Sequence, residues 1–563
     1  MGRFLLAHEY LYTPIIMNYI KNVILTLLVP LIGAAQHYSL SVEAQLKEVY
    51  RKVHPACVRA YGIDSLTRTQ NSAQFSAVVV SSDGIILTVA HAVKPGQLYK
   101  ISFPDGRSGA ARALGRIATD KETLRPDVAM MQMTETGPWP FAEMGNSDLL
   151  NTGQACFGIS YPESQNLLLP MLRHGNIITK LNNWGFVEST CIMETGDSGG
   201  PLFDEQGKLI GLHSRIDKPE GANYEVPIDV YRKYFTALKV VKNYDSLPSN
   251  ADLLPVDNVK PLPAQRREIP EKAINVLAKT KSGAVVKIYS RGDTILGTVF
   301  QLKNGKQIII SKNSEVDDSS FTVLKGRNIP LKLLKRDRAP DLAAFDIPHR
   351  LSQPVMVNSL KTLSAGDSSL NGGFLYSIMT DGIVKKSIAG LSIKELPNRF
   401  SSGGFNAYLQ EQNGCPTITK IDSGGVAQKA GLKEGDCVMR INNVQISGAK
   451  GFNSEMMKYY PGDSVYFSVR RQRDTLAVAF VLVPRILREQ PHPMNHFEGG
   501  KSLRRDGFKN VILHDARVRS YECGSPLYDL KGNLVGLNIA RFSHTTTIAL
   551  GISELMAFID TIH

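Results

Sequence analysis

The residues around Ser198 have types and a spacing that suit nucleophilic catalysis. Positions 194–203 read Glu-Thr-Gly-Asp-Ser-Gly-Gly-Pro-Leu-Phe. Glycines beside the serine permit a tight turn that a Cβ atom would hinder, so the Ser198 hydroxyl is expected to be exposed. The same turn is expected to direct the N–H groups of Gly196 and Ser198 to one point, where they would stabilise an oxyanion. The pattern predicts a serine nucleophile, provided that the chain also supplies a base and an acid.

A candidate base and a candidate acid lie upstream of this serine. Residues 78–93 read as two strands rich in β-branched residues, joined by a Ser-Asp-Gly turn, and the second strand ends in Thr-Val-Ala-His at His91. Asp127 begins an apolar segment that is expected to be a strand. An imidazole can accept the serine proton at neutral pH, and a carboxylate can orient that imidazole. The order His91, Asp127, Ser198 therefore predicts a catalytic triad, although either upstream residue alone would be an ordinary core histidine or strand cap.

Three motifs resemble those of the trypsin-like proteases. They are Thr-Val-Ala-His at 88–91, Pro-Asp-Val-Ala at 126–129 and Gly-Asp-Ser-Gly-Gly-Pro-Leu at 196–202. The lack of a cysteine after His91 and the segment Asn-Tyr-Glu-Val-Pro-Ile at 223–228 are more similar to the HtrA/Deg branch. The resemblance covers residues 46–239 and implies a chymotrypsin-like double β-barrel that hydrolyses peptide bonds without a metal or an organic cofactor. Asp197 departs from the HtrA/Deg pattern, which usually has Asn there, and is similar to the secreted trypsins.

The same resemblance points to the residues that would contact a substrate. In the trypsin-like proteases the residue six positions before the nucleophile lines the floor of the P1 pocket, and here that residue is Ile192. An apolar floor offers no partner to a buried charge, so small or medium apolar P1 side chains are expected. His213, Ser214 and Arg215 are expected to run beside the substrate backbone as an added strand. The Arg215 side chain is expected to be solvated; narrowing of the site or a preference for acidic neighbours is the alternative.

The motifs recur later in the chain in altered form. Residues 308–316 match 85–93, residues 340–345 match the Pro-Asp motif, and residues 522–537 match 197–212. An internal repeat of this kind predicts a second barrel pair in which Ser314 replaces His91, Asp341 matches Asp127 and Cys523 replaces Ser198. Ser314 cannot serve as a base for a thiol, so this copy is predicted to be degenerate and Cys523 to be inert. A separate thiol activity at Cys523 is the alternative.

Residues 416–443 resemble a PDZ domain. They read as a strand, a Ser-Gly-Gly turn, a short helix that ends at Gly431, and a Gly-Asp pair that leads into another strand. PDZ domains bind peptide C-termini by strand addition. The resemblance places the binding loop at Phe405, Asn406, Ala407, Tyr408 and Leu409, which lack the usual glycine-rich form. A PDZ domain with a purely structural role is the alternative.

Length, charge and cysteine content set broader limits. The chain has 563 residues, a formal net charge of +13 and six cysteines. Since no stripe of arginines is interleaved with aromatic residues, a solvated basic surface is expected and nucleic-acid binding is not. Weak attraction to an anionic envelope or to acidic substrates stays open. None of the cysteines forms a C-x-x-C metal pair, no metal site is expected, and free buried thiols are expected in place of a disulfide framework.

The N-terminus has the pattern of an export signal. A lysine precedes an apolar run at residues 23–35 that ends in small residues, which predicts a signal peptide cleaved after Ala35. Met17 as the true start, or an uncleaved membrane anchor, are the alternatives. The run is short for a membrane span, so no stable span is expected after cleavage. The mature protein is expected in the periplasm or cell envelope, with secretion as the other possibility.

These inferences combine into a mostly β chain. The expected parts are a signal peptide (1–35), a trypsin-like protease domain (45–240), a linker (241–270), a degenerate protease-like domain in two parts (271–400 and 485–563) and an inserted PDZ domain (401–484). The expected function is an exported serine endopeptidase that acts on misfolded or exposed polypeptides and binds C-terminal peptides at the PDZ domain. The family resemblance implies a homo-trimer. The alternative function is a non-catalytic, chaperone-like peptide-binding protein of the envelope.

Overall fold

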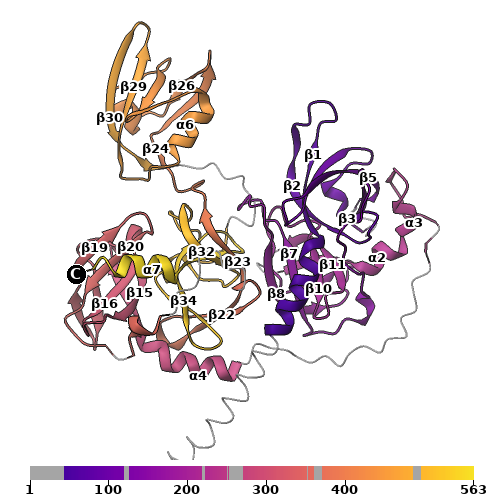
Figure 1. The fold of residues 1–563 in the computed structure, drawn as a ribbon, viewed down its shortest axis with the longest axis horizontal. Coiled ribbons are helices and arrows are strands. Elements are labelled where there is room, and N and C mark those ends of the chain that lie inside the picture. The colour runs from indigo at the N-terminus through magenta and orange to yellow at the C-terminus, as the bar shows by residue number, and fades with distance from the viewer. Residues whose placement is uncertain are drawn as a thin grey trace, which may run out of the picture. The chain divides into compact units, whose positions relative to one another are not determined.

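The computed structural model describes residues 43–118, 126–217, 222–249, 251–252, 271–351, 353–360, 370–485 and 496–562. The predicted signal peptide lies outside the described residues, as does most of the predicted linker. The chain forms two compact units (Figure 1). One holds the residues up to 283 with 371–389 and 528–534, and the other holds 284–370, 390–527 and 535–563.

The first barrel of the N-terminal unit contains six strands that pair in a closed ring, in the order β1-β2-β3-β6-β5-β4. Their bounds are β1 Cys57–Ile63, β2 Gln70–Val79, β3 Ile85–Thr88, β4 Leu98–Ser102, β5 Ser108–Ile117 and β6 Val128–Met133. The predicted Ser-Asp-Gly turn joins β2 to β3, and Gly84 adopts a φ of 91° there. The short helix η2 (Ala90–Ala92) follows β3 directly, which leaves His91 at the rim of the barrel.

The second barrel of this unit is closed in the order β10-β11-β12-β9-β8-β7. Its strands are β7 Ala155–Ser160, β8 Met171–Thr179, β9 Val187–Ser189, β10 Pro201–Asp204, β11 Leu209–Asp217 and β12 Ala222–Pro227. The other elements up to residue 281 are η1 His54–Ala56, η3 Ser147–Leu149, α2 Ile228–Lys233, α3 Phe235–Leu238, β13 Asn243–Tyr244 and α4 Glu271–Lys281.

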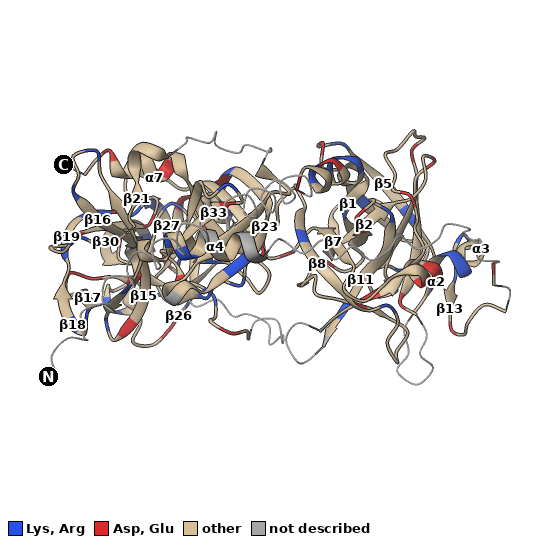
Figure 2. Ribbon diagram, turned by 90° about the horizontal axis from the view of Figure 1, so that it is seen from below, with Lys and Arg blue, Asp and Glu red and all other residues tan. Residues whose placement is uncertain are grey.

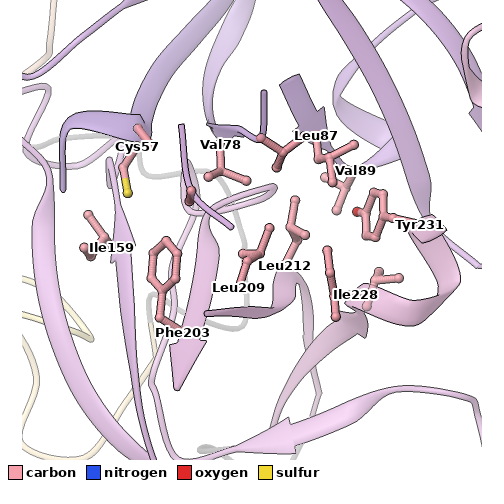
Figure 3. Packing of buried hydrophobic residues seen from close by; sticks show 14 of the residues in the cluster. Cys57, Val78, Leu87, Val89, Ile159, Phe203, Leu209, Leu212, Ile228 and Tyr231 are labelled. Atoms are coloured by element: carbon pink, nitrogen blue, oxygen red, sulfur yellow. The ribbon is translucent and has the colours of Figure 1, made fainter. Parts of the chain in front are cut away.

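One apolar cluster is shared by both barrels. Figure 3 shows Val78 and Leu87 of the first barrel facing Leu209 and Leu212 of the second. These four side chains are completely buried. Burial of a large aliphatic side chain contributes about 1.5–3 kcal/mol, so this cluster strongly favours one mutual position of the two barrels.

The segments predicted to be a second protease-like domain also form β-sheets. An eight-stranded sheet has the order β18-β17-β14-β15-β16-β20-β19, with β21 on β15, and a further barrel closes in the order β22-β23-β32-β35-β34-β33. The bounds are β14 Val285–Ser290, β15 Asp293–Gln301, β16 Gln307–Lys312, β17 Phe321–Leu324, β18 Arg327–Pro330, β19 Lys332–Asp337, β20 Leu342–Asp346, β21 Val355–Met356, β22 Phe374–Ile378, β23 Val384–Leu396, β32 Phe508–His514, β33 Pro526–Asp529, β34 Leu534–Arg541 and β35 Thr547–Gly551. Short helices join them: η4 Ser282–Ala284, η5 Asn313–Glu315, η6 Val357–Ser359, η8 Thr380–Gly382, η10 Ser520–Glu522 and α7 Ile552–Ile559.

The residues that follow β23 and precede β32 in the sequence form a separate small sheet. Its order is β25-β26-β27-β29-β30, with β28 on β27, and the pair β24-β31 lies at its base. The bounds are β24 Gly403–Gly404, β25 Ala407–Gln412, β26 Cys415–Ile421, α5 Val426–Lys429, β27 Cys437–Ile441, β28 Val444–Gln445, α6 Gly448–Met456, β29 Ser464–Arg471, β30 Asp474–Val481 and β31 Val483–Pro484. The predicted fold class, a mostly β chain with a double barrel and a small inserted sheet domain, is confirmed.

The expectation of free thiols was wrong for two of the six cysteines. Cys415 and Cys437 form a disulfide across β26 and β27, whereas Cys57, Cys156, Cys191 and Cys523 are free and buried. Sequence spacing gave no sign of the pairing, because the two residues become neighbours only when the two strands align.

Two surface properties bear on the sequence-based expectations. Lys and Arg lie beside Asp and Glu on many elements of both units (Figure 2). In the part of the chain that the structure describes, no helix is long and apolar enough to cross a bilayer.

We predict that removal of the disulfide destabilises the small sheet domain. The bond closes a loop with a sequence separation of 22. A loop of this size is worth about 3 kcal/mol through the entropy of the unfolded chain. Calorimetry of the full chain should therefore show a lower unfolding temperature for this domain in Cys415→Ala/Cys437→Ala. Reductant should lower the wild-type transition to the same value and leave the variant unchanged; equal transitions in wild type and variant would contradict the prediction.

Candidate active site

The serine turn is held by backbone contacts on both sides. Gly196 and Gly199 have φ values of 96° and 79°, a region that favours glycine. The Gly199 N–H donates to the His213 carbonyl at 2.7 Å. A Cβ atom on Gly199 would come within 2.1 Å of Thr88 Oγ1, so a larger residue does not fit. The turn therefore requires glycine for both its conformation and its close packing.

Ser76 on β2 links this turn to the first barrel. The Ser76 N–H donates to the Ser198 carbonyl at 2.9 Å, and the Ser76 hydroxyl donates to the Gly196 carbonyl at 2.8 Å. The Tyr161 N–H in turn donates to the same hydroxyl oxygen at 2.8 Å. Ser76 is completely buried. A single serine thus fixes the turn of the second barrel against a strand of the first, and no sequence motif marked it.

The three predicted triad residues lie together. His91 Nε2 is 3.0 Å from Ser198 Oγ, and His91 Nδ1 is 2.7 Å from Asp127 Oδ2. The His91 N–H donates to Asp127 Oδ1 at 3.0 Å, which orients the carboxylate. The His91 side chain is 50% exposed, whereas that of Asp127 is 2% exposed. The arrangement leaves the imidazole and the hydroxyl accessible and hides the acid behind them.

Asp127 stays ionised in spite of its burial. Burial alone would raise the pKa of its carboxyl, but hydrogen bonds from His91 and Ser214 outweigh it and hold the pKa below the usual value. Ser214 Oγ donates to Asp127 Oδ2 at 2.7 Å. Ser214 was expected to contact the substrate backbone; its hydroxyl contacts the acid.

The N–H groups of Gly196 and Ser198 are available to a ligand. Among the described residues, neither group donates a hydrogen bond to the protein. The neighbouring amides are used, since the Asp197 N–H donates to the Glu194 carbonyl at 3.0 Å. Two adjacent free donors beside a nucleophile are the arrangement that stabilises an oxyanion.

A buried ion pair anchors the side chain between these two amides. Asp197 is 0% exposed and is paired with Arg173 of β8, which is 1% exposed. Asp197 also accepts hydrogen bonds from Ser160 Oγ at 2.8 Å and from the Glu194 N–H at 2.7 Å. Arg173 Nη1 donates to the Ile192 carbonyl at 3.3 Å. The departure from Asn at position 197 is therefore matched by a buried cation, which sequence reasoning missed because the partner lies on another strand.

The later copy of these motifs has different chemistry. The Ser314 N–H donates to Asp341 Oδ1 at 2.8 Å, as the His91 N–H does to Asp127. Ser314 Oγ donates to Asp341 Oδ2 at 2.9 Å, and the buried Lys312 Nζ lies 2.9 Å from the same oxygen. No imidazole faces Asp341 among the described contacts. The Asp341 carboxylate is thus paired with a lysine in place of an imidazole.

Cys523 is a poor nucleophile in this setting. Burial raises the pKa of its thiol to about 11, and the contributions of Lys312 and Ser502 reduce this only in part. The thiolate, which is the reactive form, is then scarce at neutral pH. Its backbone still follows the serine turn: Leu296 N–H donates to the Cys523 carbonyl at 3.2 Å, and Gly524 N–H donates to the Asn538 carbonyl at 2.7 Å.

The small sheet domain has a groove beside its edge strand β25. A cavity of about 700 Å³ is lined by the segment from Ser402 to Leu409 and by Phe452 and Met456 of α6. Of the predicted loop residues, Ala407, Tyr408 and Leu409 lie on β25, and Asn406 adopts a φ of 56°. Phe405 is a core residue, 5% exposed and packed on Phe452, Phe467 and Phe480.

Gly403 and Gly404 also line this groove. They form β24 and directly precede Phe405. The predicted loop of residues 405–409 did not include this glycine pair, which belongs to the segment Ser-Ser-Gly-Gly-Phe at 401–405.

Comparison with known families agrees with both sites. Residues 75–212 match the trypsin-like peptidase domain, and residues 406–481 match the PDZ domain. The chain contains a trypsin-like peptidase domain and a PDZ domain.

Several relatives of this peptidase are described as HtrA or Deg proteases. It is 22% identical over 416 residues to a "Probable periplasmic serine endoprotease DegP-like" of Buchnera aphidicola subsp. Baizongia pistaciae. The matched residues make up 71% of this chain and 76% of the relative. A protein of the same description from Pseudomonas savastanoi pv. phaseolicola is 23% identical over 72% of this chain and 78% of its own. Serine protease HTRA1 of Xenopus tropicalis is 28% identical over 34% of this chain and 42% of its own. The predicted similarity to this group is confirmed.

One solved structure was also found to be similar. The crystal structure of the serine endoprotease from Yersinia pestis covers 78% of this chain and 97% of its own, at 14% identity and a TM-score of 0.29. A score of this size supports no argument about the fold.

Ile192, the predicted floor of the P1 pocket, and Glu225 of β12 are both buried, with exposed fractions of 5% and 0%. Glu225 Oε1 accepts a hydrogen bond from Ser189 Oγ at 2.7 Å and lies 3.3 Å from His213 Nδ1. Burial raises the pKa of Glu225 to about 7, against the opposing effects of His213 and Ser189. No motif pointed to Glu225, because a single acid in an apolar strand has no spacing signature.

The predicted substrate-binding strand is only partly free. The His213 N–H donates to the Gly200 carbonyl at 2.8 Å and its carbonyl accepts from Gly199, so the backbone of His213 is already used. Its side chain is 0% exposed. The Arg215 guanidinium lies 4.9 Å from the centre of the Phe186 ring, which accounts for its position. Contact of these residues with a substrate stays a prediction.

We predict that Arg173 and Asp197 act as one unit in the peptidase. Arg173→Met would leave an unpaired buried carboxylate, which typically costs about 3–5 kcal/mol. Urea unfolding should show this loss, and the acylation rate of Ser198 should fall at least about 100-fold because the amide donors lose their support.

The double variant Arg173→Met/Asp197→Asn is the matched control, since it removes both charges. It should recover most of the stability. A single variant as stable as the wild type would contradict the prediction.

We also predict a pH-dependent stability that depends on Glu225. The folded pKa is raised from an ordinary 4.5 to about 7, so folding favours the protonated acid. The stabilisation is fully present below about pH 4.5 and is lost as the pH rises through about 7, an effect of about 1–3 kcal/mol. Urea unfolding of the wild type between these pH values should show this decline. Glu225→Gln, which keeps an acceptor for Ser189, should show a flatter profile; an identical slope would refute the assignment.

Proposed function

We propose that the peptidase domain hydrolyses peptide bonds with Ser198 as nucleophile, His91 as base and then acid, and Asp127 as the group that orients His91. The observation that carries this proposal is the continuous hydrogen-bonded chain from Asp127 through His91 to Ser198 Oγ, next to two unused amide donors. No metal or organic cofactor takes part in the proposed reaction.

The proposed chemistry balances within these residues. Ser198 Oγ forms a bond to the scissile carbonyl carbon, and its proton passes to His91 Nε2. The oxyanion is stabilised by the N–H groups of Gly196 and Ser198, each of which is worth about 2.7–4 kcal/mol in related sites. His91 then gives the proton to the leaving amine as the C–N bond breaks. Water, deprotonated by His91, cleaves the resulting ester and restores the serine.

The proposed substrates are misfolded or exposed polypeptides of the cell envelope. The relatives named periplasmic serine endoproteases support export and proteolysis there. Ile192 supports a preference for small or medium apolar P1 residues, because the pocket floor offers no counter-charge to Lys or Arg. Beyond His213, strand β11 no longer pairs with β10, so residues 214–216 are proposed to hold the substrate backbone.

The PDZ groove is proposed to capture peptide C-termini. β25 is an edge strand, which allows a ligand to add to the sheet. The backbone of Gly404 and Phe405 lines the groove and would receive the carboxylate. The neighbouring Gly403 N–H already donates to the Tyr459 carbonyl at 2.8 Å. A peptide with a free C-terminus should bind more tightly than its amide in a titration; equal affinities would favour a purely structural PDZ domain. The family resemblance also implies a trimer, which a measurement of molar mass in solution would test.

The segments around the PDZ domain are proposed to be a second, non-catalytic copy of the protease fold. The equivalent contacts of Ser314 with Asp341, and of Cys523 with Leu296, support this relation. Lys312 and the buried thiol support the absence of hydrolysis there.

We predict that a fluorophosphonate probe labels Ser198 in the full chain. His91→Ala should abolish rapid labelling, and peptidase activity should fall by about 10⁴-fold or more in Ser198→Ala. Mass spectrometry of the labelled peptide identifies the site. Cys523→Ala serves as the matched control and should label like the wild type.

Failure of wild-type labelling, even with an unfolded protein present, would favour the non-catalytic peptide-binding function. Peptidase activity that survives in Ser198→Ala and is lost in Cys523→Ala would favour a thiol enzyme.

A further inference from the structure

The unit that contains the PDZ domain has a second large cavity, distinct from the peptide groove. Its volume is about 970 Å³, and its lining includes Ser314 and Asp341, the counterparts of His91 and Asp127. It therefore occupies the position at which the second copy would have held a substrate. The charges and positions of its side chains determine which ligand it can bind.

The one buried acid of this cavity is already neutralised. Asp341 is completely buried, and its Oδ2 lies 2.9 Å from Lys312 Nζ. Arg504 Nη1 lies 3.9 Å from Asp341 Oδ1. Asp341 would therefore not repel a negatively charged ligand in the cavity, because Lys312 already compensates the charge of this carboxylate.

The lining as a whole carries a surplus of positive charge. It contains six arginines and, with Asp341 included, three aspartates, which leaves a formal surplus of three. The arginines are Arg291, Arg336, Arg338, Arg485, Arg504 and Arg505. Besides Arg504, three of them are ion-paired: Arg336 with Asp318 at 2.8 Å, Arg291 with Asp317 at 3.7 Å, and Arg338 with Asp463 outside the lining. Arg485 has no ion-pair partner among the described residues.

Two of these guanidinium groups are held in place by aromatic rings. Arg504 lies 4.0 Å from the centre of the Tyr460 ring, and Arg505 lies 4.9 Å from that of Phe400. Arg504 also donates to the Ala339 carbonyl at 2.9 Å. A planar guanidinium that is already fixed loses little freedom when it binds a carboxylate with two parallel hydrogen bonds.

The cavity adjoins the PDZ groove. Phe400, Ser402, Pro484 and Arg485 line both. A space that favours negative charge thus lies beside a groove that suits an extended peptide. This proximity favours a polypeptide as the ligand over a free anion.

We propose that this arginine-lined cavity binds an acidic polypeptide segment, one rich in Asp and Glu, and so gives the chain a second peptide-binding site beside the PDZ groove. Binding at this site does not require hydrolysis by Ser198. A failure to bind the acidic peptide and a failure of the proposed peptidase activity would therefore be separate results.

The test is a binding titration with the full chain carrying Ser198→Ala, so that the probe is not cleaved. The probe is a short fluorescein-labelled peptide rich in Asp and Glu, with an amidated C-terminus that removes the carboxylate a PDZ groove captures. Fluorescence anisotropy should show saturable binding that weakens with added salt, because salt screens charge–charge attraction. Arg485→Gln/Arg505→Gln should weaken binding by about tenfold or more.

The matched control is Arg327→Gln/Arg473→Gln, which removes the same charge from exposed positions outside both cavities. It should bind the acidic probe like the parent chain. Equal weakening by both pairs of substitutions would mean that only net charge matters, and would overturn the proposal. Equal binding of a probe with Asn and Gln in place of Asp and Glu would also overturn it, as would full competition by inorganic phosphate at the concentration of the peptide.

Discussion

The hydrogen bonds of Ser76 are the contact on which the peptidase site depends. Ser198 belongs to the second barrel, whereas His91 and Asp127 belong to the first, so the three side chains meet only when the two barrels hold one mutual position. Ser76 fixes that position locally, with its N–H and hydroxyl on two carbonyls of the serine turn. The shared apolar cluster fixes it over a larger area, but it is not directional. Hydrogen bonds of defined geometry are needed to place Ser198 Oγ within 3.0 Å of His91.

Three buried acids are each paired with a basic side chain, and the identity of that partner separates the two sets of motifs. In the peptidase domain, Asp127 faces the His91 imidazole, and Arg173 neutralises Asp197 beside the unused amide donors. Next to Asp341 the partner is Lys312. The backbone contacts of Ser314 and Cys523 are like those of His91 and Ser198. The two sets of residues thus share backbone contacts but differ in the side chains that surround the acid.

In the function proposed here, the PDZ domain and the segments around it bind polypeptide without hydrolysing it. An edge strand and a glycine pair form one groove, and six arginines line the cavity that continues from it. Both features favour extended polypeptide, the first through backbone pairing and the second through charge. In the function proposed here, cleavage and binding are carried by separate parts of one chain, and loss of catalysis in one copy left its cleft available for a ligand.

The sequence by itself determined the elements and the residue types of the active site. The strands on both sides of Gly84, the order His91–Asp127–Ser198, the PDZ module and the repeated motifs all depend on local patterns, because turns, alternation and motif spacing are properties of neighbouring residues. The tertiary structure alone decided which residues of distant segments come into contact. Arg173 on Asp197, Ser214 on Asp127, Ser189 on Glu225 and the disulfide of Cys415 with Cys437 each join residues that are well separated in sequence. Burial and pairing across strands depend on how the sheets close, and no local spacing records that closure.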